Sequence, residues 1–133
     1  MTLEERKEYA MSLRKQGYNC AQCIVASFSD ITGIDKGLSL KIASGLGTGV
    51  ASLGEVCGVV TGMTITEGIL NSSEPAAKIK VAKTAKGLAG QFVDKNGYLR
   101  CKDLKNPLHA RPCNDLILDG IEIMHRHLSP DDK

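Results

Sequence analysis

SLGEVCGVVTG, residues 52–62, places a single cysteine, Cys57, between glycines in an otherwise apolar run. Ser52 and Glu55 have the three-residue spacing of a capping box, which predicts a helix that begins at Leu53. Apolar residues surround this predicted helix almost completely, so we expect it to be the buried central helix of the fold.

Two glycines inside the predicted helix indicate close packing. Gly58 and Gly62 lie about one turn apart, and glycine is a poor helix former in a helix interior. Because glycine has no side chain, we expect another backbone to approach both positions closely. The helix should extend to about Leu70 and be the most buried helix of the chain.

Helical patterns precede the central segment. Thr2 and Glu5 form a capping box and predict a surface helix over residues 3–16. Asn19 is a suitable N-cap for a second helix over residues 20–32, whose apolar residues recur at spacings of four, four and three. A short third helix is predicted within residues 38–47.

Two more helices follow. Proline at position 75 marks the start of a long helix, and the last helix should run from about Asn114 to His127. Both carry apolar stripes with 4-3-4 spacing, and no segment alternates with the period of a strand. The sequence therefore predicts one all-α domain, residues 1–133, of five or six helices with a glycine-rich loop before the central helix.

Composition and charge narrow the class of protein. The 133 residues carry a formal net charge of +2, with three tyrosines, two phenylalanines and no tryptophan. Such a small charge and so few rings argue against nucleic-acid binding. A charged N-terminus and the lack of a run of about 18 apolar residues predict no targeting segment, no membrane insertion and a cytoplasmic location.

The five cysteines are the strongest chemical signal. In a reducing compartment we expect thiols unless the cysteines bind metal or cycle between redox states. Cys20 lies on the inward stripe of its helix, whereas Cys23 is turned about 60° from that stripe and should lie apart. Cys57 lies on the central helix, and Cys101 and Cys113 flank a proline-containing segment. These positions, other than that of Cys23, could converge on one site.

Other short motifs are incomplete. The CxxC of residues 20–23 has neither the βαβ context of thioredoxin nor the second pair of a zinc ribbon. Gly45, Gly47 and Gly49 follow no predicted strand and precede no Gly-Lys-Ser/Thr, which argues against both common nucleotide-binding loops. Together with Gly58 they either form a structural turn or bring backbone amides to an anionic centre such as a thiolate or sulfur cluster.

The histidines are weaker candidates. His109 lies four residues before Cys113, and a neutral imidazole can ligate a metal ion. A role without metal is the plainer interpretation of this single histidine. His125 and His127 point to different sides of one helix, so we expect both at the surface.

Four motifs in order resemble one family over about residues 5–125. They are GYNCAQ, CGVVTG, CKDL and a final cysteine, and they resemble the redox-active protein family named for its C-GCAxxG-C-C pattern. The resemblance implies a redox role, with an iron–sulfur or other thiolate-bound metal centre as candidate cofactor. It implies that the family cysteines are Cys20, Cys57, Cys101 and Cys113. Val59 departs from the family pattern, which has alanine there.

Three functions remain open. In the first, all four family cysteines bind a metal or cluster that transfers electrons. In the second, pairs of them cycle between thiol and disulfide, with Cys57 and Cys20 as the candidate catalytic thiols. In the third, the cysteines only pack within a small helical binding or assembly module. A redox partner protein is expected for the first two, and Ile79 on a lysine-rich face hints at a homo-oligomer.

Overall fold

The computed structural model describes residues 1–108 and 111–129, and these form helices joined by turns. No strand occurs among them, so the predicted all-α class is confirmed. The predicted number of five or six helices is too low. The elements are α1 (Leu3–Lys15), α2 (Cys20–Ala26), α3 (Ser29–Thr32), α4 (Lys36–Ala43), the 3-10 helix η1 (Ser44–Leu46), α5 (Gly58–Ile69), α6 (Ala77–Asn96), α7 (Cys101–Leu104) and α8 (Cys113–Leu128).

Two short helices explain the difference in number. The helix predicted over residues 20–32 is divided at Phe28, whose backbone leaves the regular helical conformation with φ −110° and ψ 16°. The second is α7, whose four residues are too few to show a helical repeat of apolar positions.

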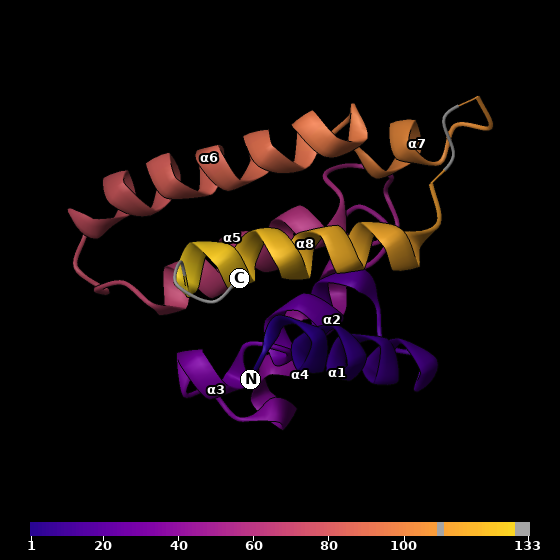
Figure 1. Cartoon of the computed structure of the whole chain (residues 1–133). Helices are drawn as coiled ribbons and strands as arrows, with labels where there is room; N and C mark the ends of the chain where they lie inside the picture. The colour runs from indigo at the N-terminus through magenta and orange to yellow at the C-terminus, as the bar shows by residue number, and fades with distance from the viewer. Residues whose placement is uncertain (109–110, 130–133) are drawn as a thin grey trace.

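Helices α5 and α8 lie in the middle of the fold, with α6 on one side and α1 to α4 on the other (Figure 1). In this arrangement α2 packs on α5, α1 packs on α8, and α6 contacts both central helices. Helices from the two ends of the chain are therefore neighbours. The starts of α2, α5 and α8 can meet because these three helices contact one another.

The first two helices begin as predicted. Thr2 and Glu5 form a reciprocal capping box, with the Glu5 backbone N–H donating to Thr2 Oγ1 over 3.1 Å. Asn19 and Gln22 form a second one, in which each side chain accepts from the other residue's backbone N–H over 2.9 Å. The second box fixes the start of α2 next to Cys20.

The capping box predicted at Ser52 is wrong, and α5 begins at Gly58 rather than at Leu53. Ser52 has φ +60°, a left-handed conformation, whereas an N-cap residue is extended. Glu55 forms an ion pair with Arg100 over 2.9 Å instead of capping a helix.

Residues 48–52 form an unusual left-handed turn. All five consecutive residues have positive φ, between 49° and 72°. For residues other than glycine this conformation costs roughly 1–2 kcal/mol each. Backbone hydrogen bonds hold the turn, including Ala51 N–H to the Gly45 oxygen over 2.8 Å and Glu55 N–H to the Gly49 oxygen over 2.9 Å. Such strain persists only where the surroundings over-determine it, and it is common at functional sites.

The close packing predicted at Gly58 and Gly62 is confirmed. A Cβ atom at Gly62 would lie 2.8 Å from Ile24 Cβ, and one at Gly58 would lie 3.0 Å from the backbone nitrogen of Ala21. Helix α2 therefore crosses α5 where α5 has no side chains. This crossing brings the start of α2 against the start of α5.

Burial differs from the predictions at two places. Helix α2 is buried at six of its seven residues, more uniformly than α5, and Cys23 is fully buried with the core. His125, expected at the surface, is also fully buried, and Arg6 Nε donates a hydrogen bond to its Nδ1 over 3.0 Å. Arg6 is itself buried and pairs with Asp30 over 2.7 Å. This network fastens α1 to α3 and α8.

The long helix α6 leaves a polar face outward, as its lysines predict. Ile79 on this helix is 71% exposed, so the contact between copies that it suggests remains a prediction. Within the described part of the chain, no helix is both long and apolar enough to cross a membrane.

Candidate functional site

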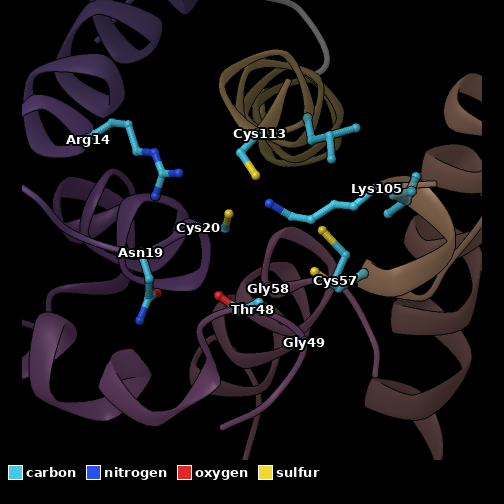
Figure 2. A pocket seen from close by; sticks show the side chains of 12 residues that line it. Arg14, Asn19, Cys20, Thr48, Gly49, Cys57, Gly58, Lys105 and Cys113 are labelled. Carbon is cyan, nitrogen blue, oxygen red and sulfur yellow. The ribbon is translucent and has the colours of Figure 1, made fainter. Parts of the chain in front are cut away.

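Four cysteines lie at the starts of four helices and line one pocket (Figure 2). Cys20, Cys101 and Cys113 are the first residues of α2, α7 and α8, and Cys57 is the N-cap residue of α5. The pocket has a volume of about 60 Å³. Its other lining residues are Arg14, Asn19, Thr48, Gly49, Gly58, Leu104, Lys105 and Leu116.

Cys113 is the cysteine that the site holds as a thiolate. The Cys20 thiol donates a hydrogen bond to it, Lys105 donates another, and together they lower the pKa of Cys113 to about 5 against the opposing effect of burial. Figure 2 shows the sulfur atoms of Cys20 and Cys113 turned toward each other, with the Lys105 side chain directed at them. A thiol with so low a pKa is ionised at neutral pH and nucleophilic.

Cys20 holds the proton of this pair. Its hydrogen bond to Cys113, together with burial, raises the pKa of the Cys20 thiol far above its ordinary value. The charge resides on Cys113 because Lys105 contacts that sulfur and because Cys113 is only half-buried, whereas Cys20 is buried. The hydrogen bond that Lys105 donates to Cys113 raises the pKa of Lys105, which therefore remains positively charged.

The N-terminus of α8 adds to the stabilisation of the thiolate. Helix α8 has 16 residues and starts at Cys113, and its N-cap, Pro112, makes no side-chain hydrogen bond to the first turn. The exposed N–H groups at a helix start carry a partial positive charge that favours a nearby anion. A thiol at this position is therefore more acidic than the same thiol within a helix.

Cys57 and Cys101 are held on either side of one backbone bridge. Val56 and Arg100 form an isolated antiparallel bridge. On one side of it, the Cys57 N–H donates to the Leu99 oxygen over 3.0 Å. On the other side, the Cys101 N–H donates to the Glu55 oxygen over 2.7 Å. Burial raises the pKa of both thiols, that of Cys57 to about 11, although the Val59 and Val60 backbone N–H groups oppose the rise at Cys57. Both are therefore neutral thiols at pH 7.

Cys23 is separate from this group. It does not line the pocket, and its sulfur lies 3.8 Å from the Tyr18 backbone oxygen. Burial raises the pKa of Cys23 to about 11. The prediction that Cys23 lies apart thus agrees with the pocket, but Cys23 is a core residue and not a peripheral one.

The predicted glycines divide into two pairs. Gly49 and Gly58 line the pocket, whereas Gly45 and Gly47 do not. A Cβ atom at Gly49 would lie 2.5 Å from the Glu55 backbone nitrogen, so the left-handed turn packs directly against the chain that leads to Cys57. His109 lies outside the described residues.

The described residues do not form a ready metal site. Among them no group of three or more His, Cys, Asp or Glu side chains is arranged to hold a metal ion. The thiolate of Cys113 instead has a thiol and an ammonium group as its partners. The donors are of the right chemical kind for a metal or cluster, but their described arrangement is that of a thiol pair.

Two charged side chains that line the pocket were not predicted from the sequence. Lys105 follows Cys101 by four residues, a spacing that places both on one side of a helical turn and could have indicated a cation near the thiols. Arg14 lies on α1 and reaches the pocket only because α1 packs against α8. No local signal for Arg14 exists in the sequence.

Comparisons with known proteins agree with the cysteine pattern. No curated protein and no solved structure matches the chain significantly. The model of the family described as "Putative redox-active protein (C_GCAxxG_C_C)" matches residues 18–127, which include all four pocket cysteines. The chain therefore belongs to this redox-active protein family.

Proposed function

We propose that the chain is a dithiol–disulfide redox protein in which Cys113 is the nucleophile and Cys20 is the resolving thiol. The observation that supports this function is the hydrogen-bonded pair itself, a thiolate on Cys113 with the protonated Cys20 thiol as its direct neighbour. The candidate catalytic pair is thus Cys20 with Cys113, in place of the pair Cys20 and Cys57 suggested by the sequence.

The reaction proceeds in two exchanges. The Cys113 thiolate attacks one sulfur of a substrate disulfide, the substrate S–S bond breaks, and one substrate thiolate departs with its electron pair. Cys20 then attacks the Cys113 sulfur of the mixed disulfide and releases the second substrate thiolate. The proton of Cys20 passes to a departing thiolate. The protein dithiol is oxidised by two electrons, and the substrate disulfide is reduced to one thiol and one thiolate, the thiol carrying the proton of Cys20.

Regeneration requires a redox partner that supplies two electrons, such as a dithiol protein. In a reducing compartment, the cytoplasm predicted from the sequence, such a partner keeps the resting protein in its dithiol form. Lys105 contributes by holding Cys113 as a thiolate, and burial keeps Cys57 and Cys101 protonated.

The experiment is oxidation of the reduced protein by one equivalent of a small disulfide without oxygen, followed by mapping of linked peptides. We expect a Cys20–Cys113 disulfide in the wild type and a mixed disulfide trapped on Cys113 in Cys20→Ser. Cys23→Ser is the matched control and should behave as the wild type. Inert thiols, or oxidation that is equally fast in Cys113→Ser, would overturn the proposal and favour a purely packing role.

A metal or iron–sulfur centre is the second candidate. It is supported by the gathering of four cysteines around one pocket with two cationic side chains, since iron–sulfur clusters and zinc are held by thiolates. Purification without oxygen, followed by iron, sulfide and zinc analysis, tests it. Stoichiometric metal that Cys57→Ser abolishes and Cys23→Ser preserves would support this candidate over the dithiol function.

A further inference from the structure

The pocket that holds Cys113 has an excess of positive charge. Arg14 and Lys105 both line it, and none of its described lining residues is an aspartate or glutamate. In the reduced site two cations thus face one thiolate, a formal balance of +1 among these side chains. Once Cys113 forms a disulfide, its negative charge is lost. Both cations then face the pocket with no negative charge on Cys113.

The two cations approach the thiol pair from different elements. Figure 2 shows the Arg14 guanidinium reaching from α1 and the Lys105 ammonium from the end of α7, with Cys20 and Cys113 between them. Arg14 Nη1 donates to the Tyr18 backbone oxygen over 3.1 Å, which holds the guanidinium near the pocket. A group bound beside Cys113 therefore lies between two positive charges.

The size of the pocket limits what can enter it. A volume of about 60 Å³ has room for roughly four to six water-sized atoms. Cys113 is half-buried, whereas the three other family cysteines are buried. A small flexible molecule can place its sulfur at Cys113, with a short charged arm beside the cations.

We propose, building on the dithiol function above, that the substrate of this site is a low-molecular-weight disulfide that carries negative charge. Its carboxylate or sulfonate group is bound by Arg14 and Lys105 while Cys113 attacks its sulfur. The S–S bond of the substrate breaks and its first half leaves as an anionic thiolate. Cys20 displaces the second half and transfers its proton to a departing thiolate, so atoms and two electrons balance as before.

Three symmetric disulfides, each with two methylene groups between the sulfur and the polar group, test this selectivity. They are 3,3′-dithiodipropionate, which is anionic, 2-hydroxyethyl disulfide, which is neutral, and cystamine, which is cationic. Each rate of Cys113 oxidation is divided by the rate of the same disulfide with free cysteine, because leaving groups differ in intrinsic reactivity. We expect the normalised rate of the anion to exceed that of the cation at least about tenfold at low salt, and the ratio to fall with added salt.

Variants at position 14 locate the selectivity. Arg14→Gln should reduce the anion-to-cation ratio severalfold, and Arg14→Lys should restore most of it. The ratio is taken within one variant, so a change in the fraction of thiolate cancels. Equal normalised rates in the wild type, or a ratio unchanged in Arg14→Gln, would overturn the inference. In either case, a Cys20–Cys113 disulfide that still forms preserves the dithiol function, whereas its absence with all three probes contradicts both.

Discussion

At the scale of single residues, Cys113 differs from the other cysteines because its neighbours donate to its sulfur. Cys23 and Cys57 are both buried, and burial raises the pKa of each to about 11. The Cys113 sulfur instead accepts one hydrogen bond from the Cys20 thiol and another from the Lys105 ammonium group. One site thus contains thiols of opposite reactivity, and their environments alone make the difference.

Lys105→Met should make the Cys113 thiol less acidic. A hydrogen bond to a charged group contributes about 1.5–3 kcal/mol, so at pH 6 we expect the rate with a neutral alkylating probe to fall about two- to fifteenfold. Near pH 9 the difference should vanish, because both proteins are then ionised at Cys113. Rate against pH is the measurement.

Lys102→Met is the matched control for this prediction. Lys102 lies on the same short helix and is exposed, but it does not line the pocket. Its substitution should leave the pH profile of the wild type unchanged. An equal loss of rate in both variants would indicate general electrostatics instead of the specific contact with Lys105.

At the scale of elements, the left-handed turn depends on one glycine more than on the others. Gly49→Ala places a Cβ atom 2.5 Å from the Glu55 backbone at φ +72°, so we expect the free energy of unfolding to fall by more than about 2 kcal/mol. Gly45→Ala meets nothing within 4 Å and should change it by less than about 1 kcal/mol. Urea denaturation of both variants checks this contrast.

The contact between α5 and α8 makes a second prediction at this scale. A Cβ atom at Gly120 would lie 2.2 Å from Val59 Cγ1, so Val59 fills the space that Gly120 leaves. Gly120→Ala should lower the free energy of unfolding by about 1–3 kcal/mol through overpacking. In a Val59→Ala background, where the side chain that fills this space is shortened, the same change should cost less.

A double-mutant cycle measures that coupling. We expect the two substitutions to be non-additive by at least about 0.5 kcal/mol, with the double variant more stable than the sum of the single effects implies. If the two effects on the free energy of unfolding were strictly additive, the absence of a side chain at Gly120 would not be what makes room for Val59.

Local signals explain what was predictable about the elements. The caps at Thr2 and Asn19 act within four residues, and the glycines at 58 and 62 record a close contact in the sequence itself. Ser52 carries the same kind of local signal, yet its backbone is left-handed because the turn is bonded to residues 45–49. A capping pattern shows that a residue is able to cap and not that tertiary structure lets it.

The candidate site was predictable in its cysteines but not in its cations. The four cysteines occur along the chain in the order of the family pattern, and this order can be seen without a structure. Arg14 and Cys113 belong to helices at opposite ends of the sequence, and only the packing of α1 on α8 brings them together. The hydrogen bond between Arg6 and the buried His125 likewise joins two residues that are far apart in the sequence. Long-range pairs of this kind leave no periodic signal.

At the scale of the whole molecule, oxidation should stabilise the fold. A Cys20–Cys113 disulfide joins α2 to α8 and closes a loop of roughly 90 residues, for which chain entropy predicts a gain of up to about 4–5 kcal/mol in the free energy of unfolding. Denaturation of the oxidised and the reduced protein measures the gain. Unchanged stability in protein shown to contain this disulfide would contradict the prediction.

Stability should also rise with pH between about 5 and 9. The folded pKa of Cys113 is about 5 and the ordinary thiol value is 9.0, so in this window the unfolded state binds more protons. The contribution of Cys113 to the free energy of unfolding is fully present above pH 9. It decreases as the pH falls and is lost as the pH falls through 5. The slope is at most about 1.4 kcal/mol per pH unit for one proton, and less because half-exposed charges are screened by solvent. Cys113→Ser should remove it.

The bridge between Val56 and Arg100 joins two stretches that are distant in the sequence, so we expect them to open and close together. The amide of Cys57 is bonded on one side of it and the amide of Cys101 on the other. A local opening that separates these backbones frees both amides for hydrogen exchange with solvent in the same event. Cys57 and Cys101, the two least exposed cysteines of the pocket, therefore become accessible together or remain protected together.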